Sequence, residues 1–382
     1  MVDEREVSGA RPPRPLGEVM FVMAKLGSIA FGGPAVHVAM LRDEVVTRRH
    51  WLDESEFLDL FGAVSILPGP SSTQLAIVLS RRRAGWAGLV LGGACFITPA
   101  MVIVLALAWS YTRYGSTPTG GGILYGVEPV VIAIVAIALW QLSRTALRRR
   151  WYSLVVAAAA AGYFAGVNVL VPLVAGGVVV SLVRNRHRLA GAPVFLPILP
   201  GAVAAGRAKP ALGAVFGEFA KLGFTVFGSG YVLLAFLRAD LVGQLHWLTE
   251  RQVLDAVAAG QVTPGPVFTT ATFVGYLLGG LPAALVATAG IFLPSFFMVA
   301  AVEPFVGRIR RSVWLGPALD GVTAAALGLM VGVAVDLGRS AIRDPLTALV
   351  GAVSLAVLLR WQPNAIWIVL AGAVVGTGHG LL

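Results

Sequence analysis

Charge is scarce in this chain. Asp, Glu, Lys and Arg together make up 13% of its 382 residues, whereas apolar residues make up 57%. Since soluble proteins carry about a quarter charged residues, this shortage excludes an ordinary soluble fold. The net charge of +10 comes from arginines gathered in short loops, where they act as orientation signals of a membrane protein and indicate no nucleic-acid partner. These loops are residues 80–83, 144–151 and 184–188.

Cysteine and the common catalytic motifs are also lacking. The single cysteine, Cys95, lies in an apolar segment, which excludes disulfides and cysteine-ligated metal sites. No G-x-x-x-x-G-K-[ST] loop is present, so ATP does not drive this chain directly, and no cofactor or metal is expected. Residues 1–15 are polar and Pro-rich, and we expect them to form a soluble tail rather than a signal peptide.

Long apolar runs are abundant. Several approach or exceed the roughly 18–20 residues needed to cross a bilayer. They predict an all-α polytopic membrane protein with about 10–13 transmembrane segments. The clearest runs are residues 86–109, 123–142, 281–302 and 318–335.

The sequence contains an internal repeat with two copies. Residues 25–74 align with residues 221–270 without a gap, and about twenty positions are identical. The match continues more weakly beyond this window and covers nearly the whole chain. Because both copies keep polar and helix-breaking residues, we favour a transporter in which two related bundles enclose a shared site. A merely structural repeat is the alternative.

The repeat divides the chain into a first membrane repeat at 16–188 and a second at 212–382, joined at 189–211 by a linker or one extra span. Each copy should contain a Gly-rich segment, a charged amphipathic connection, a Pro-Gly-Pro segment and two plain spans. The final stretches, 151–183 and 345–382, are predicted to be hairpins or pairs of short helices. The loop "SRRR" precedes the third segment in the first copy, whereas "GRIRRS" follows it in the second, which predicts inverted repeats.

Each copy breaks a membrane segment with Pro-Gly-Pro, in "LPGPSST" (67–73) and "TPGPVFT" (263–269). Irregular backbone at membrane depth is tolerated where it lines a cavity. Pro70 and Pro266 are placed to open new helices, whose free N–H groups and positive dipole ends bind anions. "FGGPAV" (31–36) offers another such terminus, and "FGSGYV" (227–232) is its partner without the proline.

The interpretation is an anion site, with a proline kink that aids helix packing as the alternative. The candidate substrate-binding residues are Gly32, Gly33, Pro34, Pro68, Gly69, Pro70, Ser71, Ser72, Thr73, Gly228, Ser229, Pro264, Gly265, Pro266, Thr269 and Thr270.

Ionisable residues recur in both copies. Lys25 and Lys221 fall inside apolar segments, where they either balance an oxyanion's charge or extend to the interface. Asp59 and Asp255 suit proton coupling, or pairing with arginines to close a gate; interface charges are the alternative. Those arginines are Arg42 and Arg238.

These motifs closely resemble the chromate ion transporter family, in its long two-repeat bacterial form. The resemblance rests on "FGGP", "HWLDESEFLDL" and "LPGPSSTQLA" and on their partners "FGSG", "HWLTERQVLDA" and "TPGPVFTTATF". It implies export of chromate across the bacterial cytoplasmic membrane, driven by the proton gradient or membrane potential, and chromate resistance. The expected partners are a small inorganic oxyanion, protons and membrane lipid, and association into a homodimer is left open.

Two other functions stay in competition. Chromate and sulfate are similar tetrahedral dianions, so a site of N–H groups and hydroxyls would distinguish them weakly. From another class, an intramembrane enzyme acting on a phosphorylated lipid is disfavoured, because the chain has no His-Glu-x-x-His, nucleophile elbow or basic phosphatase cluster. We therefore expect a transporter and no enzyme.

Overall fold

The computed structural model describes residues 16–31, 34–65, 67–115, 117–186, 210–226, 232–302, 313–361 and 363–380. Within these ranges the regular structure is helical without a β-strand, which confirms the predicted all-α class. The predicted tail at 1–15 and nearly all of the predicted linker at 189–211 lie outside the described residues.

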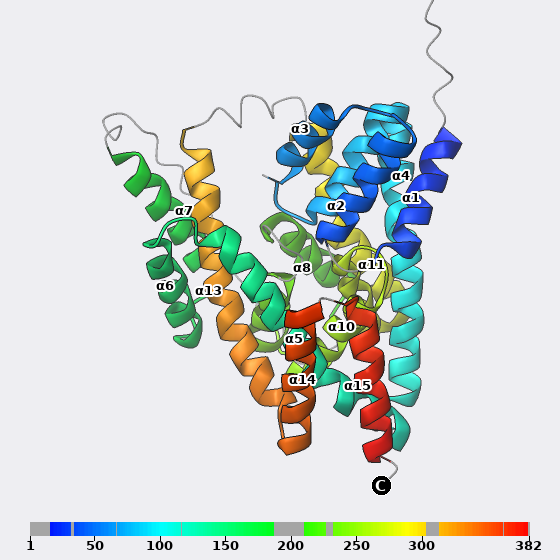
Figure 1. The fold of residues 1–382 in the computed structure, drawn as a ribbon, viewed down its shortest axis with the longest axis vertical. Helices are drawn as coiled ribbons and strands as arrows, with labels where there is room; N and C mark the ends of the chain where they lie inside the picture. The colour runs from blue at the N-terminus through cyan, green and yellow to red at the C-terminus, as the bar shows by residue number, and fades with distance from the viewer. Residues whose placement is uncertain are drawn as a thin grey trace, which may run out of the picture.

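The first copy begins with short helices and continues with long ones (Figure 1). Its elements are α1 (Leu16–Ile29), α2 (Pro34–Arg42), the π-helix η1 (Asp43–Arg48), α3 (Glu54–Val64), α4 (Ser71–Tyr114), α5 (Pro118–Ala146), α6 (Tyr152–Phe164) and α7 (Leu170–Arg184).

The second copy repeats this order of elements. They are α8 (Leu212–Thr225), α9 (Val232–Phe236), the π-helix η3 (Leu237–Gln244), α10 (Glu250–Val262), the 3-10 turn η4 (Val267–Thr269), α11 (Thr270–Val302), α13 (Leu315–Ala341), α14 (Pro345–Trp361) and α15 (Ala365–Gly380).

The duplicated sequence folds alike down to its turns. His50 and His246 both adopt positive φ, 50° and 52°, in the turn that follows each π-helix. A complete capping box then starts α3 at Asp53 and α10 at Thr249. The Asp53 carboxylate accepts the backbone N–H of Glu56, and this bond lowers the pKa of Asp53 below its ordinary value.

Four helices of the described residues are long and apolar enough to cross a bilayer: Ser71–Tyr114, Thr119–Arg144, Val267–Ala301 and Leu315–Ala341. The first and third contain sharp breaks at Gly85 (φ 68°) and Gly280 (φ 67°). The parts of α4 and α11 before these breaks are therefore short helices, and the long part of each helix begins after its break.

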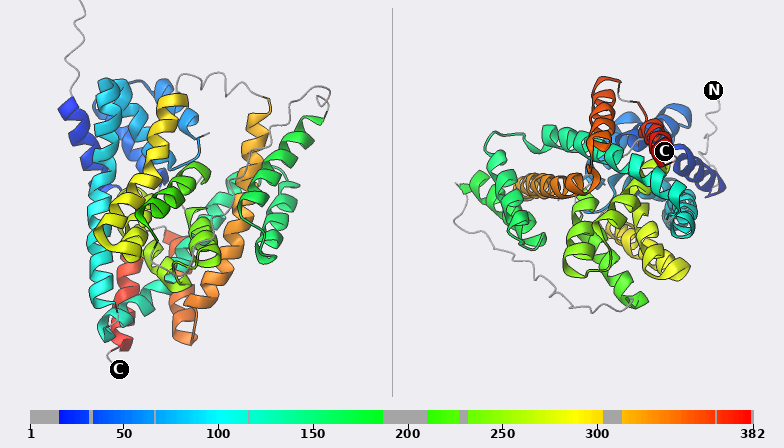
Figure 2. Two further views of the ribbon diagram at one scale, coloured as in Figure 1. Left: turned by 180° about the vertical axis from the view of Figure 1, so that it is seen from behind. Right: turned by 90° about the horizontal axis from the view of Figure 1, so that it is seen from below.

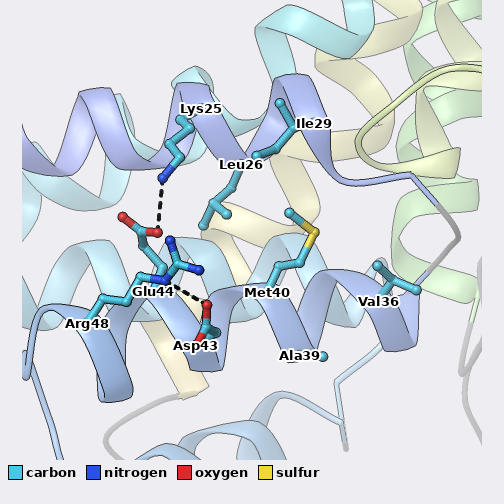
Figure 3. Close-up of a pocket in the computed structure, with 9 residues that line it drawn as sticks. All are labelled: Lys25, Leu26, Ile29, Val36, Ala39, Met40, Asp43, Glu44 and Arg48. Atoms are coloured by element: carbon cyan, nitrogen blue, oxygen red, sulfur yellow. Dashed lines mark hydrogen bonds and ion pairs between the residues drawn. The ribbon is translucent and has the colours of Figure 1, made fainter.

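Short helical hairpins surround these long helices. Helices α1 and α2 run antiparallel, so Lys25 lies beside Glu44 and Ile29 lies near Val36 (Figure 3). Helix α3 likewise turns back along the first part of α4, because residues 56–60 and 79–85 line one cleft. The Pro-Gly-Pro residues 68–70 lie at the tip of the hairpin that α3 forms with the first part of α4.

Corresponding helices of the two copies run in opposite directions. Tyr125, near the start of α5, donates a hydrogen bond to Asp344, just after the end of α13 (2.7 Å). Asp320, near the start of α13, pairs with Arg148, just after the end of α5 (3.6 Å). Helices α5 and α13 are thus antiparallel, which confirms the inverted repeats (Figure 2).

The two copies also interlock. Helix α5 packs against α14 and α15 of the second copy, and α13 packs against α6 and α7 of the first (Figures 1 and 2). Glycines permit the close approach: a Cβ on Gly126 would lie 1.9 Å from the carbonyl oxygen of Gly372, and one on Gly321 would lie 2.1 Å from that of Gly176. The short helices α6, α7, α14 and α15 confirm the predicted terminal hairpins.

Candidate functional site

The two Pro-Gly-Pro tips meet at the interface of the copies and are bonded across it. The backbone N–H of Gly69 donates to the carbonyl of Val226 at the end of α8 (2.7 Å). Reciprocally, the N–H of Gly265 donates to the carbonyl of Ala30 at the end of α1 (2.9 Å). Each tip is therefore held by the first helix of the other repeat.

Glycine is required at both tips. Gly69 and Gly265 have φ values of 110° and 95°, a region that side-chain-bearing residues rarely adopt. Space is also limited: a Cβ on Gly69 would lie 2.9 Å from Ser295 Oγ, and one on Gly265 would lie 2.9 Å from the carbonyl oxygen of Gly27. The tips are packed rather than loose.

The helices that follow the tips begin close to the predicted positions. Pro70 is the N-cap of α4, and the helix begins at Ser71, one residue later than predicted. Pro266 is the N-cap of η4, and α11 begins only at Thr270. Neither N-cap provides a side-chain hydrogen bond, so first-turn N–H groups of α4 and η4 are not capped by a side chain. Pro34 begins α2 as predicted.

A small cavity of about 10 Å³ lies between the tips, enough for about one water molecule. The first copy gives it a polar side and the second an apolar side. The lining residues are His37, Pro70, Ser71 and Ser72 from the first copy, and Pro266, Val267 and Phe268 from the second.

Sequence reasoning missed His37, although it is central here. His37 is 2% exposed, and its Nε2 lies 2.9 Å from the carbonyl of Ala30 while its Nδ1 lies 3.3 Å from Ser72 Oγ. Its ring also meets Phe96 edge-on. The repeat itself hid this residue, because the equivalent position in the second copy is Leu233. A comparison of the two copies for differences, rather than identities, would have found it.

The predicted hydroxyls differ between the copies. Thr269 and Thr270 donate to the carbonyls of Pro266 and Val267 (both 2.7 Å) and so stay within their own turn. In the first copy, Thr73 is fully buried and its Oγ1 has no hydrogen-bond partner within the described structure. Among these three threonines, Thr73 is thus the one whose hydroxyl has no partner within the described structure. The candidates Gly32, Gly33, Gly228 and Ser229 lie outside the described residues.

The two lysines form equivalent ion pairs. Lys25 contacts Glu44 (3.1 Å), and Lys221 contacts Asp240 (2.9 Å) and Glu218 (2.6 Å). Both lysines thus have carboxylate partners, so an unpaired lysine facing an anion is not what the structure shows. A groove of about 490 Å³ beside Lys25 is lined mainly by apolar side chains (Figure 3).

The arginines pair at the helix starts. Arg42 binds Glu54 at the start of α3 (2.7 Å), and Arg238 binds Glu250 at the start of α10 (2.6 Å). The sequence suggested that these arginines pair with Asp59 and Asp255. Their partners at the helix starts are instead Glu54 and Glu250, which directly follow the turn after each π-helix. Arg238 also binds Asp336 of α13 (2.8 Å).

The two aspartates have different surroundings. Asp255 is 2% exposed and accepts a hydrogen bond from Tyr111 of the first copy (2.8 Å). Asp59 is exposed on α3, where it lines a cleft of about 590 Å³ together with Arg81, Arg82 and Arg83. The repeat thus places one aspartate in the core and its equivalent at the surface.

Known proteins match both halves of this arrangement. The family model described as chromate transporter matches residues 17–181 and again residues 213–377. The chain belongs to the chromate transporter family. No solved structure matches it.

Two long relatives match nearly the whole of this chromate transporter family member, and a short relative matches about one third of it. The chromate transport protein of Cupriavidus metallidurans is 32% identical over 95% of this chain and 92% of its own length. That of Pseudomonas aeruginosa is 30% identical over 96% and 92%. An uncharacterised transporter of Bacillus subtilis, 25% identical, matches only 34% of this chain but 71% of itself, which fits a single repeat.

Proposed function

We propose that this protein exports chromate from the cytoplasm across the bacterial inner membrane, as a secondary transporter powered by the membrane potential or the proton gradient. Membership of the chromate transporter family and two relatives named chromate transport proteins support this. The observation that carries it is the meeting of two interrupted helices at the interface of inverted repeats.

The proposed site holds a dianion with neutral donors. At the start of α4, first-turn N–H groups, the positive end of the helix dipole and the hydroxyls of Ser71, Ser72 and Thr73 are all on one short stretch. Such donors stabilise negative charge in a low-dielectric site without requiring a buried cation. The paired lysines then contribute to structure near the site rather than to direct coordination.

The site must open before it binds chromate, because the present cavity has room for about one water molecule. We propose that the tips separate toward alternate sides as the repeats exchange conformations. In this structure the start of α10 is held by Arg238, which pairs with both Glu250 and Asp336. This network of Arg238, Glu250 and Asp336 is the proposed gate at the start of α10. Asp255, which is buried in the same helix, is a proposed coupling residue.

The basic side of the molecule is the proposed cytoplasmic side. The predicted loop at 80–83 is helical in the structure, so Arg81 lies within α4 before the break at Gly85. Its Nη1 donates to the carbonyls of Val299 and Ala300 at the end of α11 (3.5 and 3.3 Å). The arginines just before the break of α4 therefore lie next to the end of α11, and we propose that both face the cytoplasm. Export then runs from this face toward the face of Arg251 and Arg343.

Transport into everted membrane vesicles tests this function. Labelled chromate should accumulate in vesicles that contain the protein, and removal of both the potential and the pH gradient should abolish accumulation. Ser72→Ala should raise KM by about tenfold, because one hydroxyl bond to a charged group contributes roughly 1.5 kcal/mol. Ser55→Ala, at an exposed serine of α3, is the control. Accumulation of sulfate alone would reassign the substrate, and no accumulation of either anion would end the proposal.

A further inference from the structure

Among the described residues, the cavity between the tips is lined by one ionisable side chain, that of His37. His37 and Ser72 form its polar side, and their equivalents in the second copy are Leu233 and Phe268. The first copy therefore contributes an imidazole to the cavity, whereas the second copy has no ionisable residue at the equivalent position. An ionisable group at this depth is costly and usually functional.

The hydrogen bonds of His37 define its tautomer. A carbonyl oxygen only accepts, so the Nε2 that faces Ala30 must carry the hydrogen. In the neutral ring Nδ1 is then an acceptor, and it receives the hydroxyl hydrogen of Ser72. In this state the Ser72 hydroxyl donates to histidine and cannot donate to a ligand.

Within the described part of the chain, the groups that contact His37 are neutral. The groups in contact with it are the carbonyl at the end of α1, the Ser72 hydroxyl and Phe96 of α4. The charged side chains of its own hairpin pair with each other farther from the tip, as Lys25 with Glu44 and Asp43 with Arg48 (Figure 3). A buried imidazole without a counter-charge stays neutral, whereas a neighbouring dianion favours its protonated form.

We propose that His37 takes up one proton when the oxyanion binds and releases it when the anion leaves. The inference rests on the proposed function and adds the residue that links it to protons. On protonation Nδ1–H donates to Ser72 Oγ, so the hydrogen bond reverses. The Ser72 hydroxyl hydrogen then turns to the anion, and the imidazolium compensates half of its charge. Proton and anion stabilise each other's binding by the same factor.

This linkage has a consequence for the driving force. A dianion that travels with one proton carries a net charge of −1. The membrane potential, negative inside, favours its exit, whereas the inward proton gradient opposes it. The linkage therefore selects the membrane potential over the proton gradient as the source of energy for export.

The test is the pH dependence of anion binding to purified full-length protein. For wild type, the dissociation constant should rise by up to tenfold per pH unit as pH rises above the pKa of free His37, because one proton is bound with the anion. His37→Leu and His37→Asn should remove this dependence. Leucine is chosen because it is the buried residue at the equivalent position of the second copy, Leu233. Sulfate is used beside chromate, because chromate itself takes up a proton in mildly acidic water.

Two controls separate linkage from damage. His246→Asn should keep the wild-type slope, because His246 is exposed and asparagine accepts its positive φ. Ser72→Ala should weaken binding but keep a slope, since His37 still titrates. A His37→Leu protein that binds anions with the wild-type slope would overturn the proposal. Wild-type binding without any slope would overturn it too, but would leave the transport function standing.

A transport measurement separates the two driving forces. In proteoliposomes, an imposed potential at equal pH should drive chromate through the wild-type protein, and an acidic receiving side should slow it. Acceleration by an acidic receiving side would contradict a proton that travels with the anion. If wild type neither binds nor moves any oxyanion, the proposed function itself fails.

Discussion

Gly69 joins backbone conformation and close packing at a single residue. Its φ of 110° favours glycine, and its α-carbon faces Ser295 Oγ and the amide of Gln74, both from fully buried residues. Its N–H also donates the hydrogen bond to Val226 that holds the first tip against the end of α8. A methyl group added here would strain the backbone and push the two repeats apart.

We therefore expect Gly69→Ala to destabilise the protein by about 3 kcal/mol, from backbone strain plus displaced neighbours. Gly166→Ala is the matched control, because Gly166 has a φ of 73° but nothing within 4 Å of an added Cβ. It should cost only the backbone strain of about 1 kcal/mol. Thermal unfolding in detergent measures both, and equal losses in the two variants would show that packing at the tip is unimportant.

Individual residues were predictable from sequence where they interrupt a helix. The Pro-Gly-Pro tips and the start of α2 at Pro34 followed from helix-breaking residues alone. Side-chain partners did not follow, because they depend on which helices meet. For the lysines, the sequence left open whether they balance an oxyanion or extend to the interface, and it did not identify their carboxylate partners. His37 was overlooked because Leu233 replaces it in the second copy.

At the scale of elements, α3 and α10 show how one sequence pattern can occupy two environments. Residues 253–261 of α10 are all buried, while α3 buries only Phe57, Ala63 and Val64. Helix α10 packs against α4, α5, α13 and α15, whereas α3 packs mainly on α4. The sequence predicted that the same kind of segment occurs in both copies but could not predict this difference, because it comes from the arrangement of the other helices.

Glu128 stabilises the buried position of α10. It is 1% exposed and pairs with Arg251 of α10 (2.9 Å) and with Arg343 beyond α13. Glu128→Gln should lower the free energy of unfolding by about 2–3 kcal/mol, somewhat less than for a fully enclosed pair, because both arginines are partly exposed. It should also favour movement of α10 away from α5.

An exposed ion pair elsewhere in the protein is the control for Glu128. Glu54 and Arg42 are 45% and 48% exposed, so Glu54→Gln should cost less than about 1 kcal/mol. Unfolding in detergent compares the two variants, and protease sensitivity near Arg251 reports the release of α10. Equal stability of both variants would mean that this end of α10 is not closed by its ion pairs.

At the scale of the whole molecule, duplication predicted more than any single motif. It indicated inverted orientation and terminal hairpins, and the structure contains both. It did not predict that each hairpin covers a helix of the other repeat, because two sequences packed side by side would show the same periodicity. The exchange depends on glycine contacts such as Gly126 with Gly372, which only the assembled structure identifies.

This interlocking predicts that neither repeat is stable alone. A chain divided within 189–211 should give two fragments that disappear when expressed singly but co-purify and bind chromate when expressed together. The faces of α5 and α13 are otherwise left without α14, α15, α6 and α7, and small-residue faces associate only with closely fitting partners.

Gly126→Leu should block the association, because a Cβ there would lie 1.9 Å from a backbone oxygen, whereas Gly121→Leu on the same helix has nothing within 4 Å and should not. Pull-down with a tag on one fragment measures the association. A single fragment that is monodisperse and binds chromate would show that the exchanged hairpins are dispensable.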